Sequence, residues 1–531
     1  LGYGKRQQST LEGTLTFQHK FGELLDMNLM AGMGRYLDSG DGSDISYENA
    51  NDHIQGSSVG MADGPFYPTS YKYKNEKRSQ FVRGSFDLFG RYVVSASLRR
   101  DGTDKFFPSK KYALFPSVSL AWKMNEESFI KNISWINMLK LRASYGETGS
   151  DNLGTTLYGI VTTTREDVQF NNNSVTYIPY ILSGANYEDV TWQKTVMKNI
   201  GLDFSIFRDR IWGSVDVFRN DVTHLLGTAP TELLGMHGTR PINGGHYKRT
   251  GIDVSLNSLN LQTHDFKWTS QITMSHYNAV WIERMPNYDY QKYQKRKNEP
   301  MNAFYYYKTT GIIDMDKSNM PESQRSLGPA ACMPGYPIVE DKNGDGIIDV
   351  NDSYMDNMLP KLYFGFGNTF TWKNFDLDIF MYGQLGVKKW NDAYSYSADA
   401  GNLSRGVDAH NVGIYSYNIW NTQTNTNGYF PGIAISKSVA LPENLGFDYT
   451  RENASYIRVR NITLGYNLGP KELSVFKGYI RGIRVFVDFQ NPLTFTKYKG
   501  YDPEINTSSS NLTGGQYPQM RVYSIGAKLT F

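Results

Sequence analysis

Hydrophobic and polar residues alternate strictly between residues 362 and 384. In the first half, apolar or aromatic side chains hold one parity and small or polar ones hold the other: Leu362, Phe364, Phe366, Phe370 and Trp372 against Tyr363, Gly365, Gly367, Thr369 and Thr371. The alternation resumes at Phe375 after a turn at Lys373-Asn374, which predicts two antiparallel strands in a tight hairpin. Each strand has about eleven residues, the length that a tilted strand needs to cross a bilayer. A water-soluble sandwich could show the same alternation, but the strand length favours a membrane β-barrel.

The alternation also predicts which side chains meet lipid and which meet water. The residues expected to face lipid are Leu362, Phe364, Phe366, Leu377, Ile379, Ile525 and Leu529. Those expected to face water are Thr369, Asp376, Asp378 and Lys528. Ile457 and Val459 lie on the opposite parity from Ile462 and Leu464, so we expect a bulge or a twist near Asn461.

Hairpins of this kind recur along the whole chain and predict about fifteen strands of an all-β, transmembrane antiparallel barrel of the outer-membrane type. The long connections are expected at about residues 36–78, 148–195, 222–248, 277–360, 387–453 and 492–519. Long loops of such barrels are extracellular and short turns periplasmic, which places Leu1 outside and Phe531 in the periplasm. Because single-chain barrels of this type have an even strand number, residues 1–531 are expected to be the C-terminal portion of a larger barrel.

Composition agrees with a membrane barrel. The 531 residues include 38 Tyr, 28 Phe and 9 Trp, and aromatic girdles at the two membrane interfaces account for such an excess. Mean hydropathy is −0.49 and no run of eighteen apolar residues occurs, so strands rather than helices are expected to cross the membrane. A net charge of +3 indicates no nucleic acid partner, and the single cysteine, Cys332, excludes an intrachain disulfide.

One stretch has the spacing of a calcium loop. Oxygen ligands at positions 1, 3, 5, 9 and 12, a backbone carbonyl at position 7 and a glycine at position 6 match that motif, with Asp in place of Glu at the end. The predicted ligands are Asp341, Asn343, Asp345, Ile347 through its carbonyl, Asp349 and Asp352. The alternative is an acidic turn that needs no ion. Because no helical pattern flanks the stretch, we expect a structural Ca²⁺ clip rather than a switch.

Two long polar segments are rich in aromatic residues that could stack on sugar rings or contact a partner, or simply pack on one another. These candidates are Tyr288, Tyr290, Tyr293, Tyr394, Tyr396, Tyr415, Tyr417 and Trp420. The eight histidines show no metal-ligand spacing, and no phosphate-binding loop or nucleophile motif is present. An enzyme is therefore not expected.

Several long motifs resemble, in the same order, the TonB-dependent outer-membrane transporters of the SusC/RagA type. They are RRDGTDKF at 99–106, FPSVSLAWKMNEESFI at 115–130, LKLRASYGETGSDN at 139–152, TWQKT at 191–195, NIGLDFSIFRDRI at 199–211, DKNGDGIIDVND at 341–352, SYIRVRNITLGYNL at 455–468 and NPLTFTKYKGYDPE at 491–504. The resemblance covers nearly the whole chain. It departs from the family pattern at 354–357 and is loose at 239–251.

The resemblance implies energised import of a bulky nutrient, usually an oligosaccharide and in some members peptides, across the outer membrane of a Gram-negative bacterium. It also implies a SusD-like lipoprotein lid, a dimer of such pairs, and a barrel of about 22 strands around a plug that works with TonB. The remaining barrel strands, the plug and the N-terminal domains are expected to be absent from residues 1–531. A passive structural or adhesive barrel is the alternative from another functional class.

Overall fold

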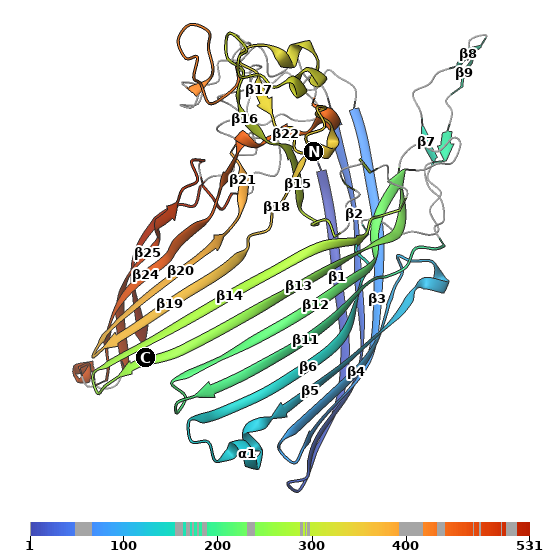
Figure 1. Ribbon diagram of the computed structural model, residues 1–531. Helices are drawn as coiled ribbons and strands as arrows, with labels where there is room; N and C mark the ends of the chain where they lie inside the picture. The colour runs from blue at the N-terminus through green and yellow to red at the C-terminus, as the bar shows by residue number, and fades with distance from the viewer. Residues whose placement is uncertain are drawn as a thin grey trace.

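The chain forms a large antiparallel sheet of 15 strands, in the order β1-β2-β3-β4-β5-β6-β11-β12-β13-β14-β19-β20-β24-β25-β26 (Figure 1). The computed structural model describes residues 2–47, 66–153, 163–165, 170–172, 175–177, 180–182, 188–230, 239–286, 290–291, 294, 298–391, 418–432, 441–470, 472–476, 479–500, 502–505 and 518–531. Strands follow one another in chain order, so each pairs with its neighbours along the sequence. The predicted all-β antiparallel fold and strand number are confirmed.

The strands of this sheet differ in length. Their bounds are β1 Gly2–Phe21, β2 Leu25–Tyr47, β3 Phe66–Leu88, β4 Tyr92–Thr103, β5 Tyr112–Lys123, β6 Ile136–Ser150, β11 Gln193–Ile206, β12 Ile211–Pro230, β13 Thr239–Gln262, β14 Phe266–Glu283, β19 Leu362–Trp372, β20 Phe375–Leu385, β24 Tyr456–Leu468, β25 Gly482–Thr496 and β26 Val522–Thr530.

The connections between the strands contain short strands and helical turns. The short strands are β7 Thr163–Arg165, β8 Phe170–Asn172, β9 Val175–Tyr177, β10 Tyr180–Leu182, β15 Ala303–Tyr307, β16 Thr309–Ile312, β17 Pro337–Val339, β18 Tyr354–Asn357, β21 Lys388–Trp390, β22 Gly446–Phe447 and β23 Arg451–Asn453. The helical turns are η2 Pro108–Lys110, η3 Met124–Glu126, α1 Ser128–Lys131, η5 Glu322–Leu327, η6 Pro329–Cys332, η7 Val350–Asp352, η9 Pro442–Asn444, η10 Asp448–Thr450 and η11 Ser474–Phe476. Among the described residues, no helix is long and apolar enough to cross a membrane.

One face of the sheet is mainly polar and the other mainly apolar, and strand pairing fixes which residues share a face. In the hairpin of β19 and β20, Thr369 pairs with Asp378 and Phe366 pairs with Met381. Polar groups therefore line one face of this hairpin and apolar groups the other. The register continues this division through Ile462 and Phe489 to Tyr523 at the last strand. We call the two sides the polar face and the apolar face. All the residues predicted to face lipid lie on the apolar face, and all those predicted to face water lie on the polar face.

A bulge lies where the parity changes on β24. Phe380 pairs with Asn461 and Met381 pairs with Val459, so Arg460 is the extra residue. The bulge keeps Val459 and Ile462 on the same apolar face. The predicted irregularity near Asn461 is confirmed.

Several strands extend further than the apolar pattern indicates. The predicted loop at 36–78 contains the ends of β2 and β3, which stay paired up to Tyr47 and Phe66, and the loop predicted at 222–248 contains the ends of β12 and β13. The bounds of these two loops were therefore wrong. Backbone hydrogen bonds continue beyond the membrane, where both faces are polar and alternation no longer marks a strand.

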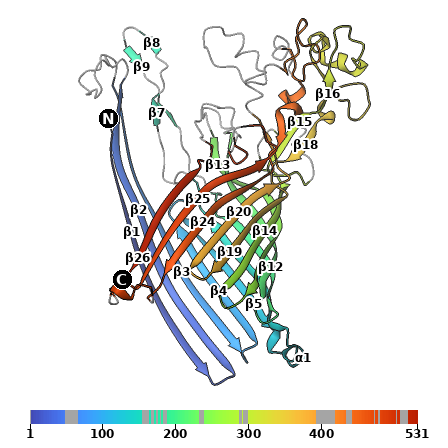
Figure 2. The same ribbon diagram turned by 90° about the vertical axis from the view of Figure 1, so that its left-hand side faces the viewer.

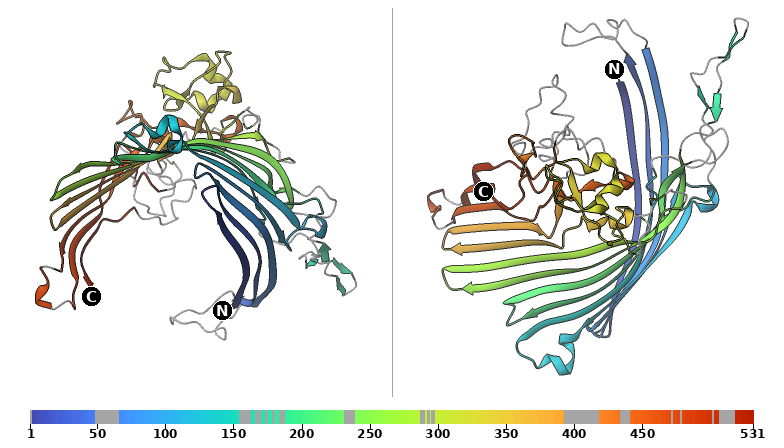
Figure 3. Two further views of the ribbon diagram at one scale, coloured as in Figure 1. Left: turned by 90° about the horizontal axis from the view of Figure 1, so that it is seen from below. Right: turned by 45° about the horizontal axis from the view of Figure 1, so that its top comes forward.

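Short turns gather at one end of the sheet and the long connections at the other, as Figures 1 and 2 show. Tight turns use left-handed backbone, with Arg208 at φ 59° and Lys373 at φ 51°. Seen from below in Figure 3, the sheet is an arch whose edge strands β1 and β26 lie apart. Within the described residues, β1 pairs with β2 alone and β26 with β25 alone.

Candidate functional site

The polar face carries paired charges near the short turns. Arg142 on β6 forms ion pairs with Asp203 on β11 and Asp216 on β12, at 2.8 and 3.0 Å. Arg484 on β25 binds Asp376 on β20 at 2.5 Å. Because every second residue of a strand points to this face, charges from neighbouring strands meet across the sheet. The result is a wall that water can wet and whose charges are largely compensated.

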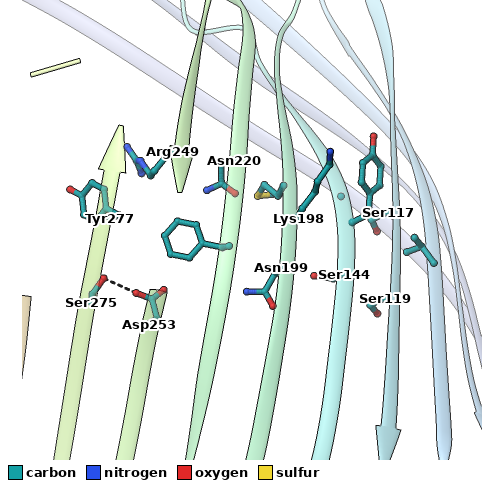
Figure 4. Close-up of a pocket in the computed structure, with 15 residues that line it drawn as sticks. Ser117, Ser119, Ser144, Lys198, Asn199, Asn220, Arg249, Asp253, Ser275 and Tyr277 are labelled. Carbon is teal, nitrogen blue, oxygen red and sulfur yellow. Dashed lines mark hydrogen bonds between the residues drawn. The ribbon is translucent and has the colours of Figure 1, made fainter. Parts of the chain in front are cut away.

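Further toward the long loops, the polar face is hollowed between β5 and β14 (Figure 4). The hollow has a volume of about 540 Å³. The side chains that line it from the polar face are four serines, two asparagines, one basic and one acidic residue, and three larger apolar or aromatic residues. In that order they are Ser117, Ser119, Ser144, Ser275, Asn199, Asn220, Arg249, Asp253, Met197, Phe218 and Tyr277. Ser275 donates a hydrogen bond to Asp253 at 2.6 Å, drawn as a dashed line in Figure 4.

Aromatic rings continue the hollow along the wall. The Arg249 guanidinium carbon lies 5.1 Å from the centre of the Tyr277 ring. Tyr277 stacks on Tyr363 of β19, with ring centres 5.7 Å apart and planes 3° from parallel. A second hollow of about 580 Å³ shares Asp253 with the first and reaches Tyr363 and Tyr382. Together the two hollows, which we call the wall groove, offer ring faces beside hydroxyl and amide groups, the groups that bind carbohydrates or peptide backbones.

A buried ion pair fixes the last long connection to this wall. Arg458 of β24 is 2% exposed and donates to Asp502 at 2.7 Å and to Glu504 at 2.5 Å. Glu504 also accepts a hydrogen bond from Tyr382, at the loop end of the wall groove, at 2.8 Å. Burial alone would raise the pKa of Asp502, but the backbone amides of Glu504 and Gln519 and the Arg458 guanidinium hold that pKa below its usual value. We call these three residues, Arg458, Asp502 and Glu504, the loop clip.

The connection between β14 and β19 folds around a small core of its own. Tyr307 on β15 is fully buried against Val339, Ile348 and Leu441. Its hydroxyl donates to the Asp349 carbonyl at 3.0 Å. Burial, aided by nearby carboxylates, raises the pKa of Tyr307, and burial raises that of Tyr336 to about 12. Both phenols therefore stay neutral at physiological pH and remain available as donors.

Backbone amides, rather than a cluster of carboxylates, organise the predicted calcium loop in this structure. Asp341 accepts from the amides of Gly344 and Gly346 at 2.7 and 2.8 Å. Asp352 is fully buried and accepts from the amides of Lys342, Asn343 and Asp349 at 2.9, 3.3 and 2.8 Å. Three such bonds leave Asp352 too few lone pairs for bidentate metal binding.

The other predicted ligands of this loop hydrogen-bond one another or nearby amides. Asn343 donates to Asp345 at 2.9 Å, and Asp345 and Asp349 accept from the amides of Ile347 and Asn351. In the part of the chain that the structure describes, no group of three His, Cys, Asp or Glu is arranged to hold a metal ion. The oxygen donor set suits Ca²⁺, and calcium binding here stays a prediction.

The comparisons with known proteins identify the chain's relatives. Residues 2–491 match the family model described as TonB dependent receptor-like, beta-barrel. The chain belongs to this family. As a member of the TonB-dependent receptor β-barrels, it is an outer-membrane protein, and its apolar face meets lipid.

Over the aligned residues, relatives within the family are about a quarter identical to this receptor barrel. TonB-dependent receptor P3 of Formosa agariphila is 27% identical over 100% of this chain and 53% of its own length. TonB-dependent receptor SusC of Bacteroides thetaiotaomicron is 27% identical over 87% of this chain and 44% of its own. The chain thus spans about half the length of the curated relatives it matches. The structure of the RagAB peptide transporter has the same fold, with a TM-score of 0.77, 21% identity, and coverage of 100% of this chain and 56% of that one.

The structure places two of the aromatic loop candidates of this receptor barrel. Trp420 is 6% exposed and its ring packs on the backbone of Gly335, so it supports the loop fold rather than facing a ligand. The Arg284 guanidinium lies 5.1 Å from the ring centre of Tyr290. The remaining candidates lie outside the described residues: Tyr288, Tyr293, Tyr394, Tyr396, Tyr415 and Tyr417.

Sequence reasoning missed the wall groove and the loop clip of the receptor barrel. Tyr277 and Arg249 share the parity of Asp253 and Ser275, so alternation carried a signal that they face the polar side. The motif that contains Asp502 supported only the family resemblance. Its contact with Arg458, 44 residues away, has no local signature.

Proposed function

We propose that this chain forms the transport wall of a TonB-dependent outer-membrane importer of a bulky nutrient, with an oligosaccharide as the substrate class. The observation that carries the proposal is the wall groove. Its serine hydroxyls, the amides of Asn199 and Asn220 and the ring of Tyr277 are suited to sugar hydroxyls and sugar ring faces. The proposed role is binding and passage, with no chemistry performed on the substrate.

The proposal extends to partners at the two ends of the wall. The names of the relatives P3 and SusC support dependence on TonB, and SusC supports a SusD-like surface lipoprotein at the end with the long loops. The plug, the remaining strands and a dimer of such pairs belong to the same proposal.

Uptake by cells that carry the full receptor tests the substrate class. Tyr277→Ala removes a ring face worth about 0.5 to 1.5 kcal/mol, so oligosaccharide affinity is expected to fall about two- to tenfold. The matched control is Tyr466→Ala on the apolar face of β24, a tyrosine that lines neither hollow of the groove. Affinity is measured by calorimetry on the purified full protein with oligosaccharide and oligopeptide panels.

Three outcomes would contradict the proposal. Binding of peptides alone would replace the substrate class with the peptide alternative. Uptake that persists in cells without TonB would contradict energised transport. Equal loss of affinity in the Tyr277 and Tyr466 variants would show that the wall groove is not the site.

A further inference from the structure

A hollow also lies on the apolar face, where the receptor meets lipid. Its volume is about 520 Å³, and its apolar-face side chains come from β1, β2, β3 and β4: Leu15, Phe17, Leu29, Ala31, Val82, Gly84, Ala96 and Leu98. The hollow lies where small residues stand on adjacent strands: Gly84 pairs with Ala96 on β4, and Ala31 follows Leu29, the partner of Gly84 on β2, along the same face. Leu15 and Val82 at its rim are 77% and 55% exposed.

Arginine side chains stand directly above this hollow on the same face. On β2 the unbroken run of apolar residues on this face reaches Met33, and the next residue on the face is Arg35. On β4 they end at Leu98, and Arg100 follows. Arg78 on β3 is the register partner of Arg35. The guanidinium groups thus lie at the edge of the apolar band nearer the long loops, which is the extracellular edge.

The three arginines outnumber Glu76, the carboxylate that binds two of them. Glu76 accepts from Arg35 at 2.9 Å and from Arg78 at 2.6 Å, although both arginine side chains remain more than half exposed, at 55% and 53%. Arg100 donates to Gln80 at 3.3 Å and lies 3.9 Å above the Tyr112 ring centre. Like charges on directly paired residues repel, and an added anion would relieve that repulsion.

We propose that β1 to β5 form a binding site for a phosphate-bearing lipid of the outer leaflet. An acyl chain occupies the apolar hollow, and the phosphate binds Arg35, Arg78 and Arg100, since guanidinium groups match phosphate oxygens in pairs. Tyr112 lies at the level where aromatic side chains anchor a barrel in the interface. The site is separate from the wall groove, because it lies on the opposite face of the sheet.

The test uses the intact receptor in phosphatidylcholine vesicles that contain a small fraction of diphosphorylated lipid A or the same lipid after dephosphorylation. Bound lipid is counted by native mass spectrometry. Each basic side chain near an anionic surface contributes about a factor of five, so the triple variant R35Q/R78Q/R100Q is expected to bind the phosphorylated lipid roughly 100-fold more weakly. The matched control is K194Q/R219Q, which removes two basic residues on the apolar face of β11 and β12, away from the hollow.

A second variant tests the hollow itself. Ala96→Phe fills it with an apolar ring and leaves every charge in place, so lipid retention is expected to fall while assembly is unchanged. Retention equal to the parent protein in both Ala96→Phe and the triple variant would overturn the proposal. Equal binding of the phosphorylated and dephosphorylated lipids would overturn it as well. Complete displacement by inorganic phosphate alone would show a simple anion site instead of a lipid site.

Discussion

Single side chains of the barrel act through the face to which the strand assigns them. Asp378 and Ile379 are neighbours in sequence, yet Asp378 accepts a hydrogen bond from Thr369 at 2.6 Å on the polar face while Ile379 lies on the apolar face. A charge on the lipid side near mid-membrane costs about 2 to 4 kcal/mol. We therefore expect Ile379→Arg to reduce assembly far more than Asp378→Arg, as measured by heat-modifiable mobility of membrane-extracted protein. Equal reductions would contradict the assigned faces.

The loop clip depends on the buried guanidinium of Arg458, which pairs with Asp502 and Glu504. Truncating one member of a buried ion pair leaves the other uncompensated and typically costs about 3 to 5 kcal/mol. Arg458→Met should therefore free residues 502–505, which hydrogen exchange would detect as lost protection of their amides. Arg460→Met is the matched control, since Arg460 is the exposed neighbour at the bulge. Unchanged exchange in the Arg458 variant would mean that other contacts hold the loop.

The same clip should depend on pH in one direction. The pKa of Asp502 is lower in the folded protein than in an unfolded chain, where it is about 3.9, so its carboxylate stabilises the fold above that value. Stability from this group is lost as pH falls through the lower, folded pKa. We expect protection of residues 502–505 to be constant from pH 8 to 5 and to decline below about pH 4. Asp502→Asn should remove this decline, and a decline already complete at pH 6 would contradict the assignment.

At the scale of elements, the alternation of apolar and polar residues predicted the membrane-spanning parts of the strands accurately. It predicted their extensions beyond the membrane poorly. The hairpin of β19 and β20 was predicted to within one residue, because one apolar and one polar face impose a period of two. The upper halves of β2 and β3 were assigned to a loop, because their side chains do not alternate between apolar and polar, although their backbones stay paired. The wall groove could not be predicted from the sequence, because its residues come from several strands. Which of these residues lie side by side depends on the register between the strands.

The bulge on β24 offers a test of register. Deleting Arg460 leaves Val459 and Asn461 adjacent, which restores plain alternation and keeps every other side chain on its face. Deleting Phe380, the partner of Asn461 on β20, instead turns Tyr382 toward lipid. We expect the first deletion to assemble in the membrane and the second to fail, by the same mobility assay. Failure of both would show that the bulge itself is required for closure.

The acidic loop at 341–352 is an element whose ion remains a prediction. Calorimetry of the full protein should show calcium-dependent heat that Asp345→Asn reduces, because Asp345 occupies a chelating position on an exposed part of the loop. The control is Asp316→Asn, an exposed carboxylate outside the loop that accepts from the amide of Ser318. If the parent protein shows no calcium-dependent heat, the loop binds no calcium. Its fold would then be explained by the amide hydrogen bonds of Asp341 and Asp352. Binding would require Asp352 to release at least one of its amide donors.

At the scale of the whole molecule, function follows from two faces of opposite chemistry on one sheet. The apolar face meets lipid, and on β1 to β4 its hollow and arginines point to a lipid ligand. The polar face presents the wall groove, and the loop clip contacts it through Tyr382. Under the proposed function, a substrate that enters from the long-loop end would meet the clip and then the groove. The proposed substrate site and the proposed lipid site use separate sets of residues, so variants of one set should leave the other intact.

The two edges of the sheet lead to the last prediction. An unpaired strand edge within lipid leaves backbone groups unsatisfied at several kcal/mol each, and single-chain barrels of this kind have an even number of strands. The sheet has 15 strands, and β1 does not pair with β26 among the described residues. We therefore expect further strands to lie between β1 and β26 in the membrane.

Cysteine crosslinking can test this arrangement in the full protein, with Cys332 replaced by Ser. Val487 and Ile525 are direct register partners on β25 and β26, so cysteines at these two positions should form a disulfide and serve as the control. Cysteines at Leu15 and Ile525 should not crosslink, because strands that complete the barrel separate them. An efficient disulfide between positions 15 and 525 would place β1 directly against β26 and would contradict a larger barrel, leaving the lumen too small for a plug and a bulky substrate.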